Sequence, residues 1–126
     1  EALGEFASLR SGRLQGDRLA AAVRGEGITA AWIFDDENAG YALARLAELG
    51  IRVPEDLTLI GFDGLPIGEA FSPPLTTISV PVAEMVRRVI AILTQPTPPS
   101  APHTHVFTPR LVERRSHGAP PAAASA

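Results

Sequence analysis

The sequence predicts an α/β domain built on an open parallel sheet that is flanked by helices. Two short apolar runs, 30–34 and 57–62, have the length of buried strands and are bounded by glycine, proline or acidic residues. Between them, apolar residues from Ala39 to Leu49 recur at helical spacing, and Gly50 stands where a helix would end in the left-handed conformation. Strand, helix and strand within about 33 residues form one crossover unit of a parallel sheet.

Further elements precede and follow this unit. Residues 17–24 predict a short helix that Asp17 caps. After the second run and a loop rich in glycine and proline, residues 75–80 predict another strand. Residues 82–94 carry the clearest helical stripe of apolar side chains in the chain, so this helix is expected to dock on a neighbouring chain or to fold back on its own sheet.

The C-terminal third contains less regular structure. The proline-rich stretch 96–103 predicts a connector without helix or strand. Residues 106–114 predict a last extended segment, which Pro109 confines to an edge or a crossover position. Residues 117–126 have nothing to bury and predict a disordered tail, so the domain itself is expected to span 1–116.

Composition limits the possible functions. The chain has 126 residues and 45% hydrophobic content, enough for one domain with a core. With 14 acidic against 11 basic residues, it does not have the charge of a polyanion-binding protein, so any nucleic-acid contact needs a part outside this chain. The absence of cysteine excludes disulfides, thiol catalysis and cysteine-ligated zinc. No apolar run approaches the ~18–20 residues of a membrane span, which predicts a soluble protein.

No set of residues predicts catalysis or a cofactor. The sequence contains no glycine-rich dinucleotide motif, no P-loop and no nucleophile elbow, and its hydroxyl residues lack a histidine at an interpretable spacing. The acids 35–37 permit a magnesium interpretation, but that class of site needs a lysine on a later strand, and all basic residues here are arginine. His103 and His105 lack a nearby third ligand.

Two acids stand where ligands bind in open parallel sheets. Asp35 follows the first predicted strand and Asp63 follows the second, so both carboxylates are expected at the same sheet edge. A carboxylate there accepts hydrogen bonds from hydroxyl or amine groups of a polar ligand. The alternative is structural: Asp35 or Asp36 caps the next helix, and Asp63 forms a turn with Gly64. Spacing alone leaves both interpretations open.

The large aromatic residues are expected in the core. Trp32, Phe34, Phe62 and Phe71 lie within or beside predicted strands and loops, where core packing is the default explanation. Phe6 fits this explanation least, because it stands in a polar segment before any core element.

Three motifs in a fixed order carry a resemblance to a known family. They are Gly-Ile-Arg-Val-Pro-Glu-Asp, Gly-Phe-Asp and Ser-Pro-Pro-Leu-Thr-Thr, all within 28–81. This stretch resembles the effector-binding domain of LacI/GalR-type bacterial transcription regulators, and 108–116 resembles the closing segment of that family. The resemblance implies a periplasmic-binding-protein-like fold, in which two α/β subdomains joined by three crossovers clamp a small ligand.

The resemblance also sets expectations about organisation. The chain corresponds to the C-terminal subdomain together with helix 82–94, which in relatives belongs to the other subdomain. The DNA-binding headpiece and most of the N-terminal subdomain have no counterpart, so the chain is either a fragment or a truncated relative. Such regulators act in the cytoplasm as dimers, reach operator DNA through the headpiece and carry out no catalysis. A truncated module that dimerises without binding a small molecule is the alternative function.

Carried over residue by residue, the resemblance implies a site and an interface. Asp63, Asp35 and Phe6 match positions that contact the effector, which is expected to be a sugar or a nucleobase; the family's arginine ligand lies upstream of residue 1. Helix 37–48 and loop 66–72 match a two-fold dimer interface, which implies roles there for Tyr41, Ile67 and Phe71. Asp35 replaces the usual asparagine and Gly64 replaces a usual second acid or asparagine, so the identity of the effector stays open.

Overall fold

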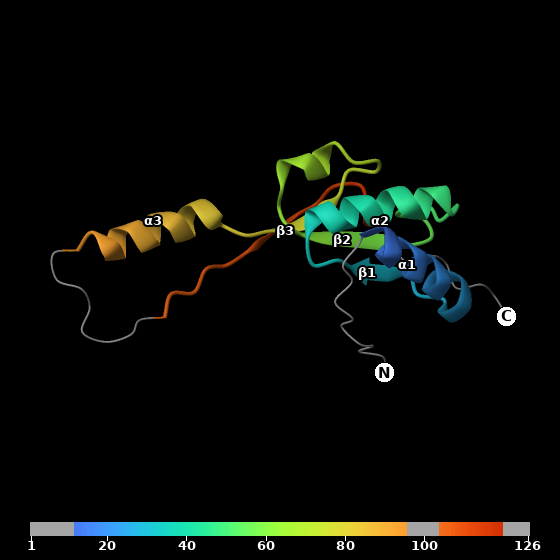
Figure 1. The fold of residues 1–126 in the computed structure, drawn as a ribbon, viewed down its shortest axis with the longest axis horizontal. Helices are drawn as coiled ribbons and strands as arrows, with labels where there is room; N and C mark the ends of the chain where they lie inside the picture. The colour runs from blue at the N-terminus through green and yellow to red at the C-terminus, as the bar shows by residue number, and fades with distance from the viewer. Residues whose placement is uncertain (1–11, 96–103, 120–126) are drawn as a thin grey trace.

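The computed structural model describes residues 12–95 and 104–119, and every structural statement below refers to these residues (Figure 1). Phe6 and His103 lie outside them. The elements, in chain order, are α1 (Gly12–Glu26), β1 (Ala30–Trp32), α2 (Asp36–Glu48), β2 (Thr58–Asp63), the 3-10 helix η1 (Pro66–Glu69), β3 (Thr76–Ser79), α3 (Val82–Leu93) and β4 (Arg110–Val112).

The four strands form one open sheet in the order β1-β2-β3-β4. The first three strands are parallel, with Trp32 opposite Ile60 and Ile60 opposite Thr76. β4 pairs antiparallel with β3 at the edge of the sheet, immediately after Pro109. The predicted α/β class and the open sheet are confirmed, and the antiparallel edge strand makes the sheet mixed.

Helices α1 and α2 cover one face of the sheet, and the core lies between these helices and the strands (Figure 1). Ile33, Leu59 and Leu75 point into this core. The prediction that the run 30–34 is a buried strand is wrong for two of its side chains: Trp32 is 49% exposed and Phe34 is 72% exposed. Alternation along the strand sends these two aromatic side chains to the other face, where no described helix packs.

Helix α1 is longer than the sequence predicts. It begins at Gly12 rather than at residue 17, so Asp17 lies inside the helix and does not cap it. Gly12 and Gly16 are both buried against α2: a Cβ on Gly16 would lie 2.7 Å from the Cβ of Arg45. Glycine has a low helix propensity, so the sequence alone does not predict a helix over these first turns of α1. Contact with α2 stabilises them.

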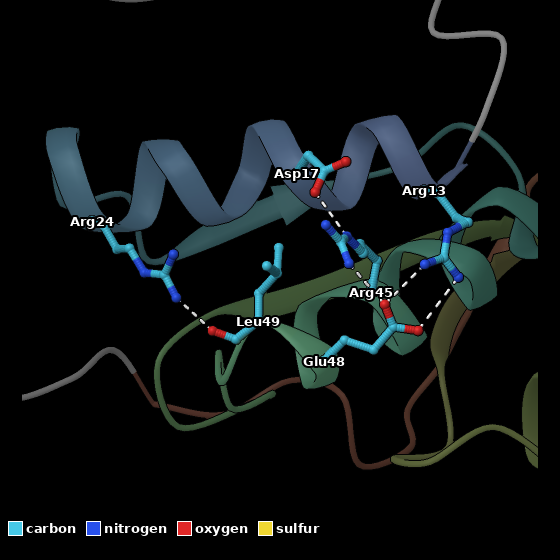
Figure 2. Close-up of polar contacts among 6 residues, drawn as sticks. All are labelled: Arg13, Asp17, Arg24, Arg45, Glu48 and Leu49. Carbon is cyan, nitrogen blue, oxygen red and sulfur yellow. Dashed lines mark hydrogen bonds and ion pairs between the residues drawn. The ribbon is translucent and has the colours of Figure 1, made fainter.

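Polar side chains connect α1 to α2 along the outer edge of their contact (Figure 2). The Arg45 guanidinium donates to Asp17 at 2.7 Å and to Glu48 at 2.8 Å, and Arg13 donates to Glu48 at 2.9 Å. The hydrogen bonds from Arg45 and then Arg13 lower the pKa of Glu48. Because these groups face solvent, the ion pairs are screened by water and contribute little to stability.

Helix α2 ends as predicted. Gly50 has a φ of +74°, in the left-handed region, and the Ile51 amide returns to the carbonyl of Leu46 at 2.9 Å. The turn that follows is held by Asp56, which accepts hydrogen bonds from the backbone and side chain of Arg52. These bonds lower the pKa of Asp56 to about 2.

Helix α3 forms where the sequence predicts it but makes no extensive contact with the described strands or helices. It stands away from the sheet at the end of two extended segments, one leaving β3 and one leading to β4 (Figure 1). None of its residues is buried. The expectation that this helix folds back on its own sheet is therefore wrong. Docking on a neighbouring chain stays a prediction.

The segment after β4 closes the domain. The Ser116 hydroxyl donates to the Leu59 carbonyl at 2.6 Å and accepts from the Thr76 amide at 2.8 Å. His117 and Gly118, which the sequence placed in the unstructured tail, contact Thr76 and Thr58 through hydrogen bonds of 2.8 and 3.2 Å. Residues 120–126 lie outside the described residues. Within 12–95 and 104–119, no helix has the length and apolar character needed to cross a membrane.

Candidate functional site

The candidate site lies at the carboxyl ends of β1 and β2, where three acids come together. Asp63 is the last residue of β2, and its side chain is exposed. Its φ is +105° and that of Gly64 is +77°, so the strand ends in a sharp turn with two consecutive left-handed residues. The two positive φ values agree with the turn interpretation, although Asp63 still belongs to β2, and the Asp63 carboxylate lies at the rim of the sheet.

Asp35 is the N-cap of α2. Its Oδ1 accepts a hydrogen bond from the Asn38 amide at 2.7 Å, and its Oδ2 accepts one from the Asn38 side-chain amide, also at 2.7 Å. The capping interpretation of Asp35 is confirmed. Each carboxylate oxygen has a second lone pair, so capping leaves acceptor capacity for a ligand.

Asp36 has a role that the sequence did not reveal. Its side chain is fully buried, with Oδ1 accepting from the Thr77 hydroxyl at 2.6 Å and Oδ2 accepting from the Leu65 amide at 2.6 Å. The helical period could have indicated this burial. Asp36 precedes the buried residues Ala39 and Leu43 by three and seven positions, which places all three on the same face of α2.

Electrostatic interactions distinguish Asp63 from other surface acids. Partial desolvation, followed by the negative charges of Asp36 and Asp35, raises the pKa of the Asp63 carboxyl above its ordinary value of 3.8. No described arginine forms an ion pair with any of the three acids. The rim therefore favours a ligand that donates hydrogen bonds or carries positive charge.

A metal ion does not account for this cluster. In the described part of the chain, no group of three or more acids and histidines has the arrangement of a metal site. Both carboxylate oxygens of Asp36 accept hydrogen bonds, one from an N–H group and one from an O–H group, and a cation would have to displace these donors. His105 is exposed and accepts from the Arg88 side chain at 3.4 Å, away from the rim.

Aromatic side chains line the open face of the sheet next to the rim. The Phe34 and Phe62 rings stack with centroids 5.8 Å apart, and Trp32 packs edge-on against both, at 6.5 and 6.0 Å. The expectation that these residues belong to the core is wrong for Trp32 and Phe34, which are exposed. Phe6, expected to contact the effector, lies outside the described residues.

A shallow apolar groove continues from this face toward α3. Its volume is about 390 Å³, and it lies where the two extended segments leave the sheet. The residues lining it are Phe62, Val80, Pro81, Met85, His105, Val106, Phe107 and Pro109. None of these side chains is an acid, so the groove is chemically distinct from the rim.

The three expected interface residues differ in their surroundings. Tyr41 is 61% exposed and Ile67 is 53% exposed, so both are available for contact with another chain. Phe71 is half-buried and covers Gly40, where a Cβ would lie 2.3 Å from the Phe71 ring. Phe71 therefore packs within its own chain.

An open α/β sheet with acids at the carboxyl ends of neighbouring strands defines a class of small-molecule-binding domains. Residues 5–117 match the model of the periplasmic binding protein-like domain. Over 88 residues the chain is 39% identical to the HTH-type transcriptional repressor PurR of Vibrio atlanticus (strain LGP32), covering 68% of this chain and 26% of PurR. The chain thus spans about a quarter of the length of this relative.

Solved structures give the same result. A LacI family transcriptional regulator from Arthrobacter sp. FB24, in complex with lactose, superposes with a TM-score of 0.73 at 30% identity, over 86% of this chain and 43% of that one. A dimeric Lac repressor superposes with a TM-score of 0.70 at 26% identity, over 86% and 41%. The chain belongs to the periplasmic-binding-protein-like domain family, in the form found in LacI/GalR-type transcriptional regulators. These relatives are transcriptional regulators rather than enzymes, in agreement with the absence of a catalytic motif.

Proposed function

We propose that this chain is the effector-sensing and dimer-forming part of a LacI/GalR-type transcriptional regulator. Its ligand is a small polar molecule that binds at the carboxyl ends of β1 and β2 and donates hydrogen bonds to Asp63 and Asp35. The position of Asp63 carries the proposal: its carboxylate is exposed at the rim, and its pKa is raised by desolvation and by two neighbouring acids. A ligand donor at this point would stabilise a charge that the fold itself leaves poorly compensated.

The proposed ligand is a sugar, with a nucleobase as the alternative. Hydroxyl groups of a sugar are suited to a rim of acceptors, and the lactose complex of the Arthrobacter regulator supports this class. Phe6 would provide the apolar surface against which the sugar or base packs, and an arginine upstream of residue 1 would complete the site.

In the intact regulator, the ligand would control DNA binding through the angle between two subdomains. Two chains would pair through the surface that carries Tyr41, Ile67 and Phe71, and a change of angle would alter the spacing of two DNA-binding headpieces in the cytoplasm. The ligand can shift this equilibrium only as far as its affinities for the two angles differ. Operator DNA would be contacted only by the headpiece, which is outside this chain.

Calorimetry of the intact regulator tests the proposed ligand role of Asp63. Titration with lactose, other sugars and nucleobases identifies the ligand, and Asp63→Ala is expected to weaken its binding by about 1.5–3 kcal/mol, the range for a hydrogen bond to a charged group. Glu55→Ala is the matched control, because it removes one acid from an exposed turn at the opposite end of β2. Equal affinity for the Asp63→Ala variant and the parent would remove Asp63 from the site.

The second candidate function is dimerisation without a small-molecule ligand. It is favoured by the exposure of Tyr41 and Ile67, which leaves two apolar side chains available for contact with another chain. Light scattering that shows dimers, together with a melting temperature that no sugar or nucleoside changes, would support this alternative over the first proposal.

A further inference from the structure

The buried carboxylate of Asp36 joins three segments that meet behind the rim. Asp36 itself belongs to the first turn of α2; its partners are the Thr77 hydroxyl on β3 and the Leu65 amide in the loop after β2. The backbone of β2 makes room for it at Gly61, where a Cβ would lie only 2.2 Å from Asp36 Oδ1. A residue larger than glycine at position 61 would clash with the Asp36 carboxylate. Gly61 therefore provides the space that this carboxylate occupies.

The same network holds the backbone on either side of Asp63. Asp63 has a φ of +105°, which L side chains rarely adopt and which needs support from its surroundings. The Gly64 amide donates to the Thr77 hydroxyl oxygen at 3.3 Å, and the Leu65 amide donates to Asp36. Thr77 thus acts as donor to Asp36 and as acceptor from Gly64, because a hydroxyl oxygen carries both a proton and lone pairs.

We propose that Asp36 and Thr77 are positioning residues: they fix the direction in which Asp63 presents its carboxylate, and they tie that carboxylate to the loop that carries η1. The ligand role of Asp63 rests on the proposed function above, whereas the positioning of its backbone does not. Asp36 and Thr77 are fully buried and have no contact with the rim surface, so they act only through Asp63 and its two following amides.

The second part of the proposal concerns the loop 64–71. Leu65 is the N-cap residue of η1, and no side chain within η1 caps its first turn. The Asp36 bond to the Leu65 amide is therefore the polar anchor at the start of η1, which carries Ile67.

Amide hydrogen exchange in the 126-residue chain tests the positioning role without any ligand. Thr77→Val removes the hydroxyl at nearly constant volume and is expected to speed exchange at Gly64 and Leu65 on the order of tenfold relative to the rest of the chain. Thr77→Ser, which keeps the hydroxyl, is expected to restore protection. Thr76→Val is the matched control, since Thr76 is equally buried but bonds Arg114 and His117 instead.

A second measurement separates positioning from general destabilisation. Thr77→Val leaves the formal charge unchanged, so a shift in the pKa of Asp63, followed by carboxyl-carbon NMR, reports a change in its distance to Asp35 and Asp36 or in the hydrogen bonding of Asp36. The proposal expects this shift for Thr77→Val and not for Thr76→Val. The same exchange and titration pattern in both valine variants would overturn it. Local effects in the Thr77→Val variant, with no sugar or nucleobase bound by the intact parent, would support the positioning role and count against the proposed function.

Discussion

At the residue scale, the acids of the rim differ in what the fold gives each of them. Asp35 receives two donors from Asn38, and Asp36 receives donors from Thr77 and Leu65. Asp63 receives neither a donor nor an arginine among the described residues, and its pKa is raised as a result of desolvation and of its acidic neighbours. A ligand site often contains such a group, because a stable fold would otherwise have compensated it.

The charge of Asp63 is expected to reduce stability at neutral pH. A carboxyl whose folded pKa is raised contributes its full stability below its unfolded pKa, near 3.8, and loses stability as pH rises through the folded pKa. Asp63→Asn should therefore raise the free energy of unfolding more at pH 7 than at pH 3, as measured by urea unfolding.

Asp56→Asn is the opposite control for this experiment. Arg52 lowers the pKa of Asp56 to about 2, so its charge stabilises the fold above the unfolded pKa, and this stability is lost as pH falls toward 2. Asp56→Asn should destabilise the protein at pH 7, with a smaller effect at pH 3. If Asp63→Asn changed stability equally at both values, its charge would not oppose folding.

The residue scale also shows the limit of sequence patterns. The positions of Asp35 and Asp63 after apolar runs could be predicted, because the carboxyl ends of parallel strands share one edge. The partners of Asp36 could not, because Leu65 and Thr77 lie about 30 and 40 residues further along the chain. The helical period places Asp36 on the buried face of α2 but does not show which donors it meets there.

At the element scale, contact between helices decides the extent of α1. Gly12 and Gly16 allow α1 to approach α2 closely, whereas a Cβ added to Gly25 in the same helix would meet no heavy atom within 4 Å. The ion pairs of Figure 2 lie around this contact and face solvent. Close packing is therefore expected to contribute more to the α1–α2 contact than the ion pairs do.

Alanine substitutions at two glycines of α1 test this difference. Gly16→Ala is expected to destabilise the protein by roughly 1–3 kcal/mol, since the added methyl group would meet Arg45 and the Ala42 carbonyl. Gly25→Ala gains helix propensity in open space and should stabilise by about 0.4–1 kcal/mol. Urea unfolding with unchanged m-values measures both; stabilisation by Gly16→Ala would contradict the close contact.

At the scale of the whole molecule, two large apolar surfaces of the described residues stand out as uncovered. One is the sheet face with Trp32 and Phe34, and the other is the length of α3 from Val82 to Leu93, which stands apart from the sheet (Figure 1). The matched part of this chain covers 26% of PurR and 43% of the Arthrobacter regulator, so these relatives are about two to four times as long as the matched part. The sheets of α/β domains usually have helices on both faces, whereas the described residues cover only one face of this sheet.

Substitutions on the predicted dimer surface separate association from folding. Tyr41→Glu and Ile67→Glu are expected to shift the protein toward monomers in sedimentation velocity with little change in monomer stability, since both side chains are exposed. Leu14→Glu, at another exposed apolar position, is the control and should leave association unchanged.

Phe71→Ala should act differently from the two surface substitutions. Because Phe71 packs over Gly40, its loss is expected to lower the free energy of unfolding by roughly 1–3 kcal/mol, less than the ~3–5 kcal/mol typical of a fully buried phenylalanine. Unchanged association in both the Tyr41→Glu and Ile67→Glu variants would place the dimer surface elsewhere.

Local patterns in the sequence suffice for the α/β class, the strand–helix–strand unit, the left-handed Gly50 that follows α2 and the family, because periodicity, turn residues and motifs act over a few residues. Contacts between distant residues set the rest: where α1 begins, which face of β1 is covered, where α3 points, and which donors meet Asp36 behind Asp63. Each of these depends on partners far away in the chain, and burial is a property of the contacts that a residue makes rather than of the residue itself.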